Sequence, residues 1–220
     1  RNPGKVSLAD NMAAITVSTD TGMSDLQTPV AFVRTAADNT DKWWALANKM
    51  YKSASTNPTS AWAVDGIAST PSAPLYDMIE FRSNLIVAIS TDLSRLVAGT
   101  WTGAWWSTAT GGFALSANPH RFGIIAGNLI LTDGRNIHKY DGTTITQNAI
   151  QLPTQYRGDW IKVSGDFAYI GTTNIVGGEA AVFAWDGINT QSYNAIYPIN
   201  DTAALCGFLI RGIIHIVTKR

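Results

Sequence analysis

The chain has 220 residues, of which 45% are hydrophobic and only 15% are charged. Sixteen Lys and Arg residues balance sixteen Asp and Glu residues, so the net charge provides no field that would attract nucleic acid or an anionic membrane. No apolar run of about 20 residues occurs, so no membrane-spanning helix is expected.

Strands are expected from the start of the chain. The stretches "MAAITVST" and "PVAFVRT" within residues 1–40 are strand candidates, and "DKWWALANKMYKS" favours strands over a helix because aromatic residues interrupt its helical face. Further on, short runs rich in Val, Ile and aromatics are separated by Gly, Asn, Asp and Ser; they are "NLIVAIS", "NLILTD", "DFAYIG", "AVFAW" and "IIHIVT". This pattern predicts an all-β protein.

Two landmarks repeat along the chain. The first is a tripeptide that ends in Gly: Val64-Asp65-Gly66, Trp101-Thr102-Gly103, Tyr140-Asp141-Gly142 and Trp185-Asp186-Gly187, at intervals of 37, 39 and 45 residues. The second is an apolar residue, a polar turn and an apolar run, starting at Phe81, Ile125 and Val163, at intervals of 44 and 38. A fainter copy starts at Leu205 or at Ile210.

A period of about 40 to 45 residues with several short strands per unit is typical of a β-propeller blade. We expect four blades over 41–204, divided as 41–80, 81–122, 123–162 and 163–204, with 205–220 starting another. Residues 1–40 would either complete that last blade in a closed five-bladed ring or belong to a preceding blade of a larger ring. Neither end of the sequence has the features of a natural terminus, which favours a fragment of a longer chain.

The tripeptides are expected to have a structural role. Asp-Gly supplies the positive-φ positions of a tight hairpin, and the preceding aromatic would wedge between neighbouring sheets. The residues expected in these repeat turns are Asp65, Gly66, Gly103, Asp141, Gly142, Asp186 and Gly187.

The units "KYDGTTIT" and "FAWDGINTQS" resemble the divergent propeller repeats of bacteriophage and other virion proteins, and the resemblance covers about 180 residues. Similar units occur in kelch-like and tectonin-like propellers, whereas the Gly-His and Trp-Asp hallmarks of WD40 blades are missing. The resemblance implies a structural protein of the virion, such as a phage tail nozzle, hub or adaptor.

Catalytic and metal-binding motifs are scarce. "STDTGMS" at residues 18–24 resembles the Asp-box of sialidases, which is a structural turn, but Asp25 stands where that box has an aromatic. His120, His138 and His215 have no zinc-site spacing, and His138 is expected to be solvent-facing or lightly packed. Cys206 is expected to be a small buried apolar residue. We therefore expect no metal, no cofactor and no enzyme activity.

Two tryptophan doublets, Trp43-Trp44 and Trp105-Trp106, offer ligand-binding candidates. On a strand, neighbouring side chains point to opposite faces, so one ring of each pair should be inward and the other outward. An outward ring could stack on a sugar or lie at a subunit contact.

Two functions are considered. The first is a non-catalytic propeller that binds other protein subunits, as a homo-oligomer within a larger assembly such as a virion. The alternative is a secreted glycan-binding or sialidase-like propeller, in which Trp105, Trp106 or Trp185 stacks on sugar and two carboxylates act as acid and base. Asp133, Asp159 and Asp166 are the carboxylate candidates, and the neutral, weakly charged composition favours the first function.

Overall fold

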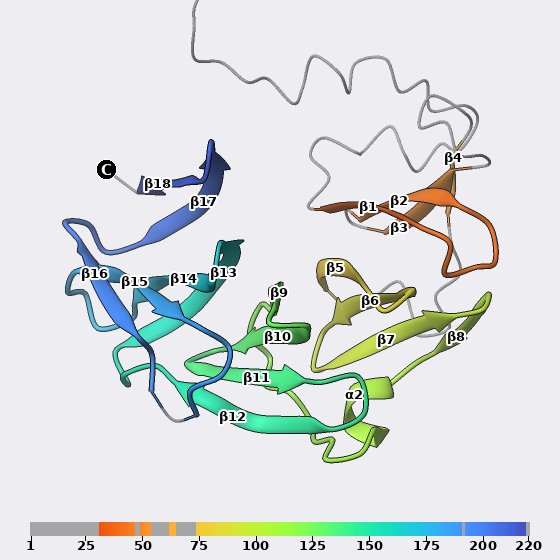
Figure 1. The fold of residues 1–220 in the computed structure, drawn as a ribbon, viewed down its shortest axis with the longest axis horizontal. Helices are drawn as coiled ribbons and strands as arrows, with labels where there is room; N and C mark the ends of the chain where they lie inside the picture. Colours follow the sequence, from red (N-terminus) through yellow and green to blue (C-terminus); the bar gives the residue numbers. More distant parts are fainter. Residues whose placement is uncertain (1–30, 47–48, 54–61, 65–73, 191, 219–220) are drawn as a thin grey trace, which may run out of the picture.

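The structure is a computed structural model that describes residues 31–46, 49–53, 62–64, 74–190 and 192–218. In this part of the chain, four four-stranded antiparallel sheets are arranged as the blades of a β-propeller, and a two-stranded sheet follows the last blade (Figure 1). The predicted all-β propeller is therefore confirmed. Within each blade the strands follow one another in chain order, so that every pairing is a hairpin or a short meander.

The first blade contains β1 (Ala31–Thr35), β2 (Lys42–Leu46), β3 (Met50–Ser53) and β4 (Trp62–Val64). The second contains β5 (Leu75–Phe81), β6 (Asn84–Ile89), β7 (Asp92–Val97) and β8 (Thr100–Thr102). The third contains β9 (Phe122–Ile125), β10 (Asn128–Asp133), β11 (Asn136–Tyr140) and β12 (Ile145–Gln151). The fourth contains β13 (Tyr156–Ser164), β14 (Phe167–Asn174), β15 (Ala180–Trp185) and β16 (Ala195–Ile199), and the last sheet contains β17 (Ala204–Ile210) and β18 (Ile213–Thr218).

The second sequence landmark is the hairpin that joins the first strand of a blade to its second strand. Arg82 and Ser83 have φ values of 51° and 59°, and Ala126 and Gly127 have φ values of 49° and 73°. Two successive positive φ values define the type I′ turn, whose twist matches that of the flanking strands. Because the landmark lies at the end of the first strand, the first, second and fourth blades begin one strand before residues 41, 81 and 163, whereas β9 of the third blade begins at Phe122, next to the expected boundary at 123.

The same turn occurs once more, near the end of the chain. Arg211 and Gly212 have φ values of 50° and 79° and join β17 to β18. Of the two starting points considered for the faint copy, the structure therefore selects Ile210. At the other end, "PVAFVRT" contains β1, so this stretch belongs to the first blade, whereas "MAAITVST" lies outside the described residues.

The Gly-ending tripeptides do not occupy equivalent positions in their blades, so the prediction that they are copies of a single repeat is wrong. Tyr140 and Trp185 end the third strands of their blades. Trp101 lies instead on β8, the fourth strand of its blade, and Val64 ends β4, also a fourth strand. Asp65 and Gly66 lie outside the described residues. The similar intervals arose because third and fourth strands of successive blades are separated by similar lengths of chain.

The expected aromatic wedge between blades is confirmed. The ring centroids of Trp101 and Trp44, from the second and first blades, are 6.2 Å apart at an interplanar angle of 88°. Tyr140 of the third blade lies 5.8 Å from Phe81 of the second. Trp185 of the fourth blade shares a buried cluster with Ile125 of the third. Each aromatic therefore fills the space between two sheets, where apolar burial is the main source of stability.

The Asp-Gly loops are Asx turns rather than two-residue hairpins. Asp141 Oδ1 accepts hydrogen bonds from the backbone N–H groups of Thr143 and Thr144, both at 2.8 Å. Asp186 Oδ1 accepts in the same way from Ile188 and Asn189, both at 2.9 Å. These bonds favour the ionised carboxylate and are the largest cause of the lowered pKa of Asp141. At Asp186 desolvation acts to raise the pKa, but these bonds and those from the Asn194 and Asn189 side chains lower it.

The glycine after each of these aspartates lies against the preceding blade. Gly187 has a φ of 75°, and a Cβ added there would lie 2.6 Å from Ile125 Cγ2. At Gly142, with a φ of 101°, an added Cβ would overlap the Arg82 guanidinium. Both first hairpins, which carry Arg82 and Ile125, are therefore in direct contact with the loop of the next blade.

We expect Gly187→Ala to lower the free energy of unfolding by about 1–3 kcal/mol more than Gly165→Ala. Both glycines have positive φ, but a Cβ at Gly165 would meet nothing within 4 Å. The difference between the two variants therefore isolates the contact with Ile125. Urea unfolding monitored by tryptophan fluorescence measures it, and equal losses in the two variants would contradict the packing argument.

Candidate functional site

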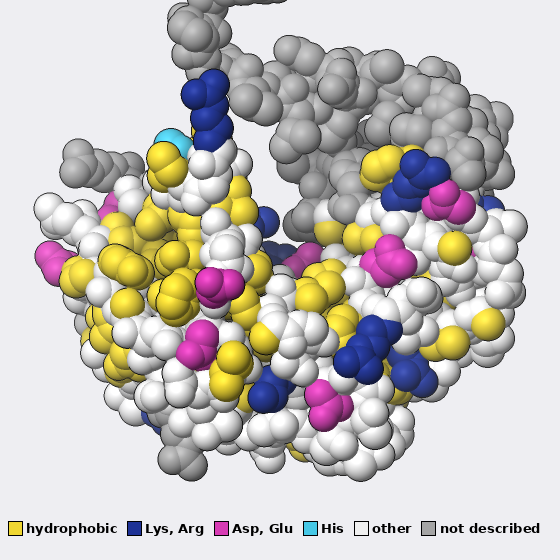
Figure 2. Space-filling view, in the orientation of Figure 1, with side chains coloured by type: hydrophobic (Ala, Val, Ile, Leu, Met, Phe, Trp, Pro, Cys, Tyr) yellow, Lys and Arg dark blue, Asp and Glu magenta, His cyan; other side chains and the backbone are white. Residues whose placement is uncertain are grey.

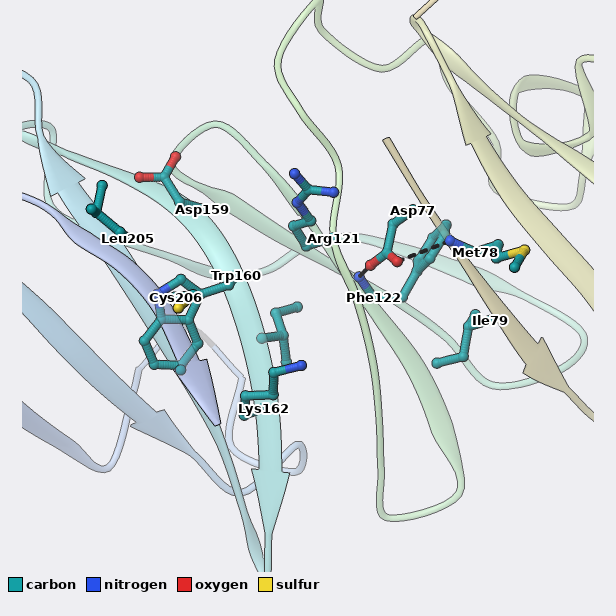
Figure 3. Close-up of a pocket in the computed structure, with 12 residues that line it drawn as sticks. Asp77, Met78, Ile79, Arg121, Phe122, Asp159, Trp160, Lys162, Leu205 and Cys206 are labelled. Atoms are coloured by element: carbon teal, nitrogen blue, oxygen red, sulfur yellow. Dashed lines mark hydrogen bonds between the residues drawn. The ribbon is translucent and has the colours of Figure 1, made fainter. Parts of the chain in front are cut away.

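The first strands of four successive sheets surround a cavity of about 380 Å³ at the centre of the ring (Figure 3). β5, β9, β13 and β17 each contribute to its wall, together with Arg121, which precedes β9. The chemically active side chains in the wall are Asp77, Arg121, Asp159, Lys162 and Cys206. Propellers bring their first strands together at the axis, so residues distant in the sequence meet here.

Asp77 ties the second blade to the third. Its carboxylate accepts hydrogen bonds from the backbone N–H groups of Met78, at 2.9 Å, and of Phe122 on β9, at 3.0 Å (Figure 3). Burial raises the pKa of Asp77, although the two N–H donors and the nearby cations Arg121 and Lys162 act in the opposite direction. This carboxyl is thus held between two strands and is partly shielded from water.

The other polar groups of the wall also have structural partners. Arg121 Nη1 donates to the Tyr76 carbonyl oxygen, which is a second tie between the second and third blades. Asp159 accepts from Arg157 Nε at 2.8 Å and from the Thr173 hydroxyl. The carboxylates of Asp77 and Asp159 are therefore engaged in hydrogen bonds on different strands of the cavity wall.

Trp160 closes one side of the cavity. Its indole Nε1 donates to the Ala204 carbonyl oxygen at 2.8 Å, and its ring lies against Gly207 on β17. A Cβ at Gly207 would come within 2.6 Å of the ring, so the glycine allows β17 to approach the fourth blade closely. Cys206, beside it, is exposed, so the expectation of a buried cysteine is wrong.

A buried His120–Asp133–His138 cluster was missed from the sequence. His138 Nε2 lies 3.4 Å from Asp133 Oδ2, and His120 Nδ1 lies 3.9 Å from Asp133 Oδ1. Both imidazoles are fully buried, so the expectation that His138 faces solvent is wrong. The spacing of His120 and His138 in the sequence does not predict that they lie close together, because their contact through Asp133 depends on how the link before β9 folds back over β10.

The hydrogen bonds of this cluster are structural. His120 bridges the Thr132 carbonyl oxygen, at 2.9 Å, and the Ser90 carbonyl oxygen of the second blade, at 3.0 Å. Burial alone would raise the pKa of Asp133, but hydrogen bonds from His138 and Ser116 and the nearby His120 lower it. The Ser116 hydroxyl contacts the carboxylate and not an imidazole, so the arrangement lacks the serine–histidine contact that activates a nucleophile.

The tryptophan doublets behave differently from each other. Trp43 and Trp44 lie on β2, where Trp44 is buried and Trp43 is half-buried, consistent with alternation along a strand. Trp105 and Trp106 instead lie in a short helix, α2 (Trp105–Thr108), and are only 4% and 0% exposed. The expectation of one outward ring in this second pair is wrong.

The local cause of this helix is Asp92. Its Oδ1 accepts hydrogen bonds from the backbone N–H groups of Trp106 and Ser107, at 3.0 and 3.2 Å. A side chain from β7 therefore provides the hydrogen-bond acceptor that the N–H groups of the first helical turn lack within the helix. The helix places Trp105 against Tyr140, with ring centroids 5.1 Å apart. Gly103 lies two residues before this helix, in the link to the third blade.

The remaining sugar-stacking and acid–base candidates are not brought together. Trp185 is fully buried, with its indole Nε1 bonded to the Asn189 carbonyl oxygen. Asp133 lies in the histidine cluster and Asp159 in the wall of the central cavity, while Asp166 is exposed in the hairpin between β13 and β14. The "STDTGMS" stretch lies outside the described residues.

No protein-family model matches this sequence, and no curated protein matches it either. In the part of the chain that the structure describes, none of the helices has the length and hydropathy of a membrane span. Within the same residues, no group of three or more His, Cys, Asp and Glu side chains is placed to hold a metal ion. Function therefore has to be inferred from the fold and from the chemistry of its surfaces.

We expect Asp77→Asn to gain stability relative to the wild type as the pH rises from about 4 to 7. Folding raises the pKa of Asp77, so in the wild type the cost of ionising the buried carboxyl appears as pH passes from its unfolded pKa to its folded pKa. Each unit of pKa difference corresponds to about 1.4 kcal/mol. Urea unfolding of both proteins across this range measures the trend, and a difference that does not change with pH would contradict it.

Proposed function

We propose that this chain is a non-catalytic interaction propeller, which binds other protein subunits, including further copies of itself, in a larger assembly such as a virion tail. The observation that carries the proposal is the exposed apolar surface of the last sheet. Among the described residues, nine of the fourteen exposed large hydrophobic side chains lie on β16, β17 and β18. Figure 2 shows hydrophobic side chains gathered over this side of the molecule.

One face of the β17–β18 sheet is turned away from the fourth blade, and we call it the distal face. Cross-strand partners share a face of a sheet, and the pairs Phe208–His215 and Ile210–Ile213 place these side chains together. Val217 and Cys206 extend the same face. Phe208, Ile210, Ile213 and Val217 are 43%, 41%, 64% and 42% exposed, and the described part of this face carries no Asp, Glu, Lys or Arg.

The corresponding faces of the second and third blades are covered. On the second blade, Phe81 and Ile86 pack against Tyr140 and Leu129 of the third. On the third, Ile125 and Ile130 pack against the fourth. Among the described residues, no strand covers the distal face in this way. A contiguous exposed apolar face is the usual mark of a protein-binding surface, and depletion of charge is typical of the centre of an interface.

The polar residues support a non-catalytic role. Asp77, Arg121, Asp159 and the His120–Asp133–His138 cluster are engaged in hydrogen bonds that join neighbouring strands or blades. The use of these groups in hydrogen bonds within the protein supports a structural role for them. The resemblance of "KYDGTTIT" and "FAWDGINTQS" to virion propeller repeats supports placement in a virion.

The proposal predicts that the purified chain self-associates through the distal face. We expect Ile213→Asp to raise the dissociation constant at least about tenfold, equivalent to roughly 1.4 kcal/mol, because it places a charge in an apolar contact. Val176→Asp is the matched control, since Val176 is 74% exposed but lies in the β14–β15 loop. Sedimentation equilibrium over a wide concentration range measures both.

A wild-type chain that remains monomeric at every concentration would contradict self-association. Equal weakening by Ile213→Asp and Val176→Asp would instead show that association occurs without a specific role for the distal face. Circular dichroism of both variants checks that the blades stay folded.

A further inference from the structure

The wall of the central cavity carries two cationic side chains from different blades. Arg121 precedes β9, and Lys162 lies on β13. Burial raises the pKa of Asp77, and the charges of both cations oppose this effect, so both lie near the same carboxyl. In Figure 3 the Lys162 ammonium points away from β13 toward β9, and the Arg121 guanidinium lies between Asp77 and Asp159. The two positive charges therefore converge in the cavity.

Both cations keep hydrogen-bond donors that the described residues do not use. Lys162 is exposed and forms no hydrogen bond with any described residue. Arg121 donates from Nη1 to the Tyr76 carbonyl oxygen, while its Nε and Nη2 groups have no acceptor among the described residues. The Nε–Nη2 edge of a guanidinium matches the two oxygens of a carboxylate. Arg34 shows this arrangement in the same chain, because its Nε and Nη2 donate to Asp41 at 3.1 and 2.5 Å.

The charges of the wall leave a positive excess. Asp159 is paired with Arg157, at 2.8 Å between Oδ1 and Nε, so its charge is already balanced. Asp77 is the other acidic side chain of the wall. It balances one of the two cations when it is ionised and neither of them when it is protonated. The excess therefore persists in both states, and it attracts an anion more strongly in a partly buried site than it would in water.

The rest of the wall is largely apolar. Figure 3 shows Trp160 and Leu205 on one side of the cavity and Ile79 and Phe122 on the other. The volume of about 380 Å³ is sufficient for a small organic molecule. Apolar walls with a few convergent polar groups are typical of small-molecule sites. The cavity therefore suits a ligand that has one anionic end and an apolar body.

We propose that the central cavity binds a small molecule in which a carboxylate is attached to an apolar body. The carboxylate accepts hydrogen bonds from Arg121 Nε and Nη2 and from the Lys162 ammonium, and the apolar body lies against Trp160 and Leu205. A phosphate group would be attracted by the same two cations, but free phosphate has no apolar part to fill the rest of the cavity. The inference does not rest on the proposed function, because neither cation lies on the distal face.

Cys206 provides a reporter for the site. It is the single cysteine of the chain, it is exposed, and it contributes to the cavity wall. The rate at which uncharged iodoacetamide alkylates Cys206, followed by intact-protein mass spectrometry, therefore measures access to the cavity. The experiment uses a protein concentration at which sedimentation shows a monomer, so that self-association through the distal face does not contribute.

We expect saturating benzoate to slow the alkylation of Cys206 at least about fivefold, with a half-maximal effect at millimolar concentration for a ligand of this size. Benzamide, the uncharged analogue of the same shape, should have little effect. Lys162→Met should raise the half-maximal benzoate concentration at least about fivefold, because it removes one charge-assisted hydrogen bond, and Lys162→Arg should retain binding. Lys139→Met is the matched control, since Lys139 lies on β11 outside the cavity wall.

Absence of protection by benzoate would overturn the proposal, and so would equal protection by benzoate and benzamide or protection that Lys162→Met does not weaken. Protection by inorganic phosphate without protection by benzoate would also overturn it and would identify a site for a free anion. Circular dichroism reports whether Lys162→Met remains folded. If that variant does not fold, the comparison of benzoate with benzamide on the wild type decides the question by itself.

Discussion

The ring depends on one repeated contact, in which the first hairpin of a blade packs against the third strand of the next blade and the loop that follows this strand. Phe81 meets Tyr140, and Ile125 meets Trp185 and Gly187. A blade buries both faces only when it has a neighbour on each side, which explains why strands such as β6, β10 and β15 are almost continuously buried. Large aromatic side chains suit this contact because they bury much area with few rotatable bonds.

Polar residues reinforce the same boundaries between blades. Asp77 and Arg121 join the second blade to the third near the axis, His120 joins them farther out, and Trp160 joins the fourth blade to β17. A buried hydrogen bond contributes little net stability but is costly to leave unmade, so these bonds mainly determine how the sheets align.

The propeller class was predictable because hairpin turns and apolar runs are local features. The turn at Ile125–Asn128 and the strands within residues 42–53 depend on neighbouring residues alone. The position of each tripeptide within its blade was less predictable. Trp101 and Tyr140 have similar sequence surroundings, but one lies on a fourth strand and the other on a third. A spacing near one blade length does not distinguish the third strand of a blade from the fourth, so the strand on which each tripeptide lies was predicted incorrectly.

By itself, the sequence determined the all-β class, the repeat length and the presence of an aromatic between blades, because each follows from local propensity and periodicity. Only the tertiary structure decided which polar residues meet: Asp92 reaches across to start α2, two distant histidines flank Asp133, and Asp77 contacts β9. It also decided that Cys206 and the distal face are exposed. The physical reason is that these contacts join residues far apart in the chain, and burial depends on whether a neighbouring sheet is present.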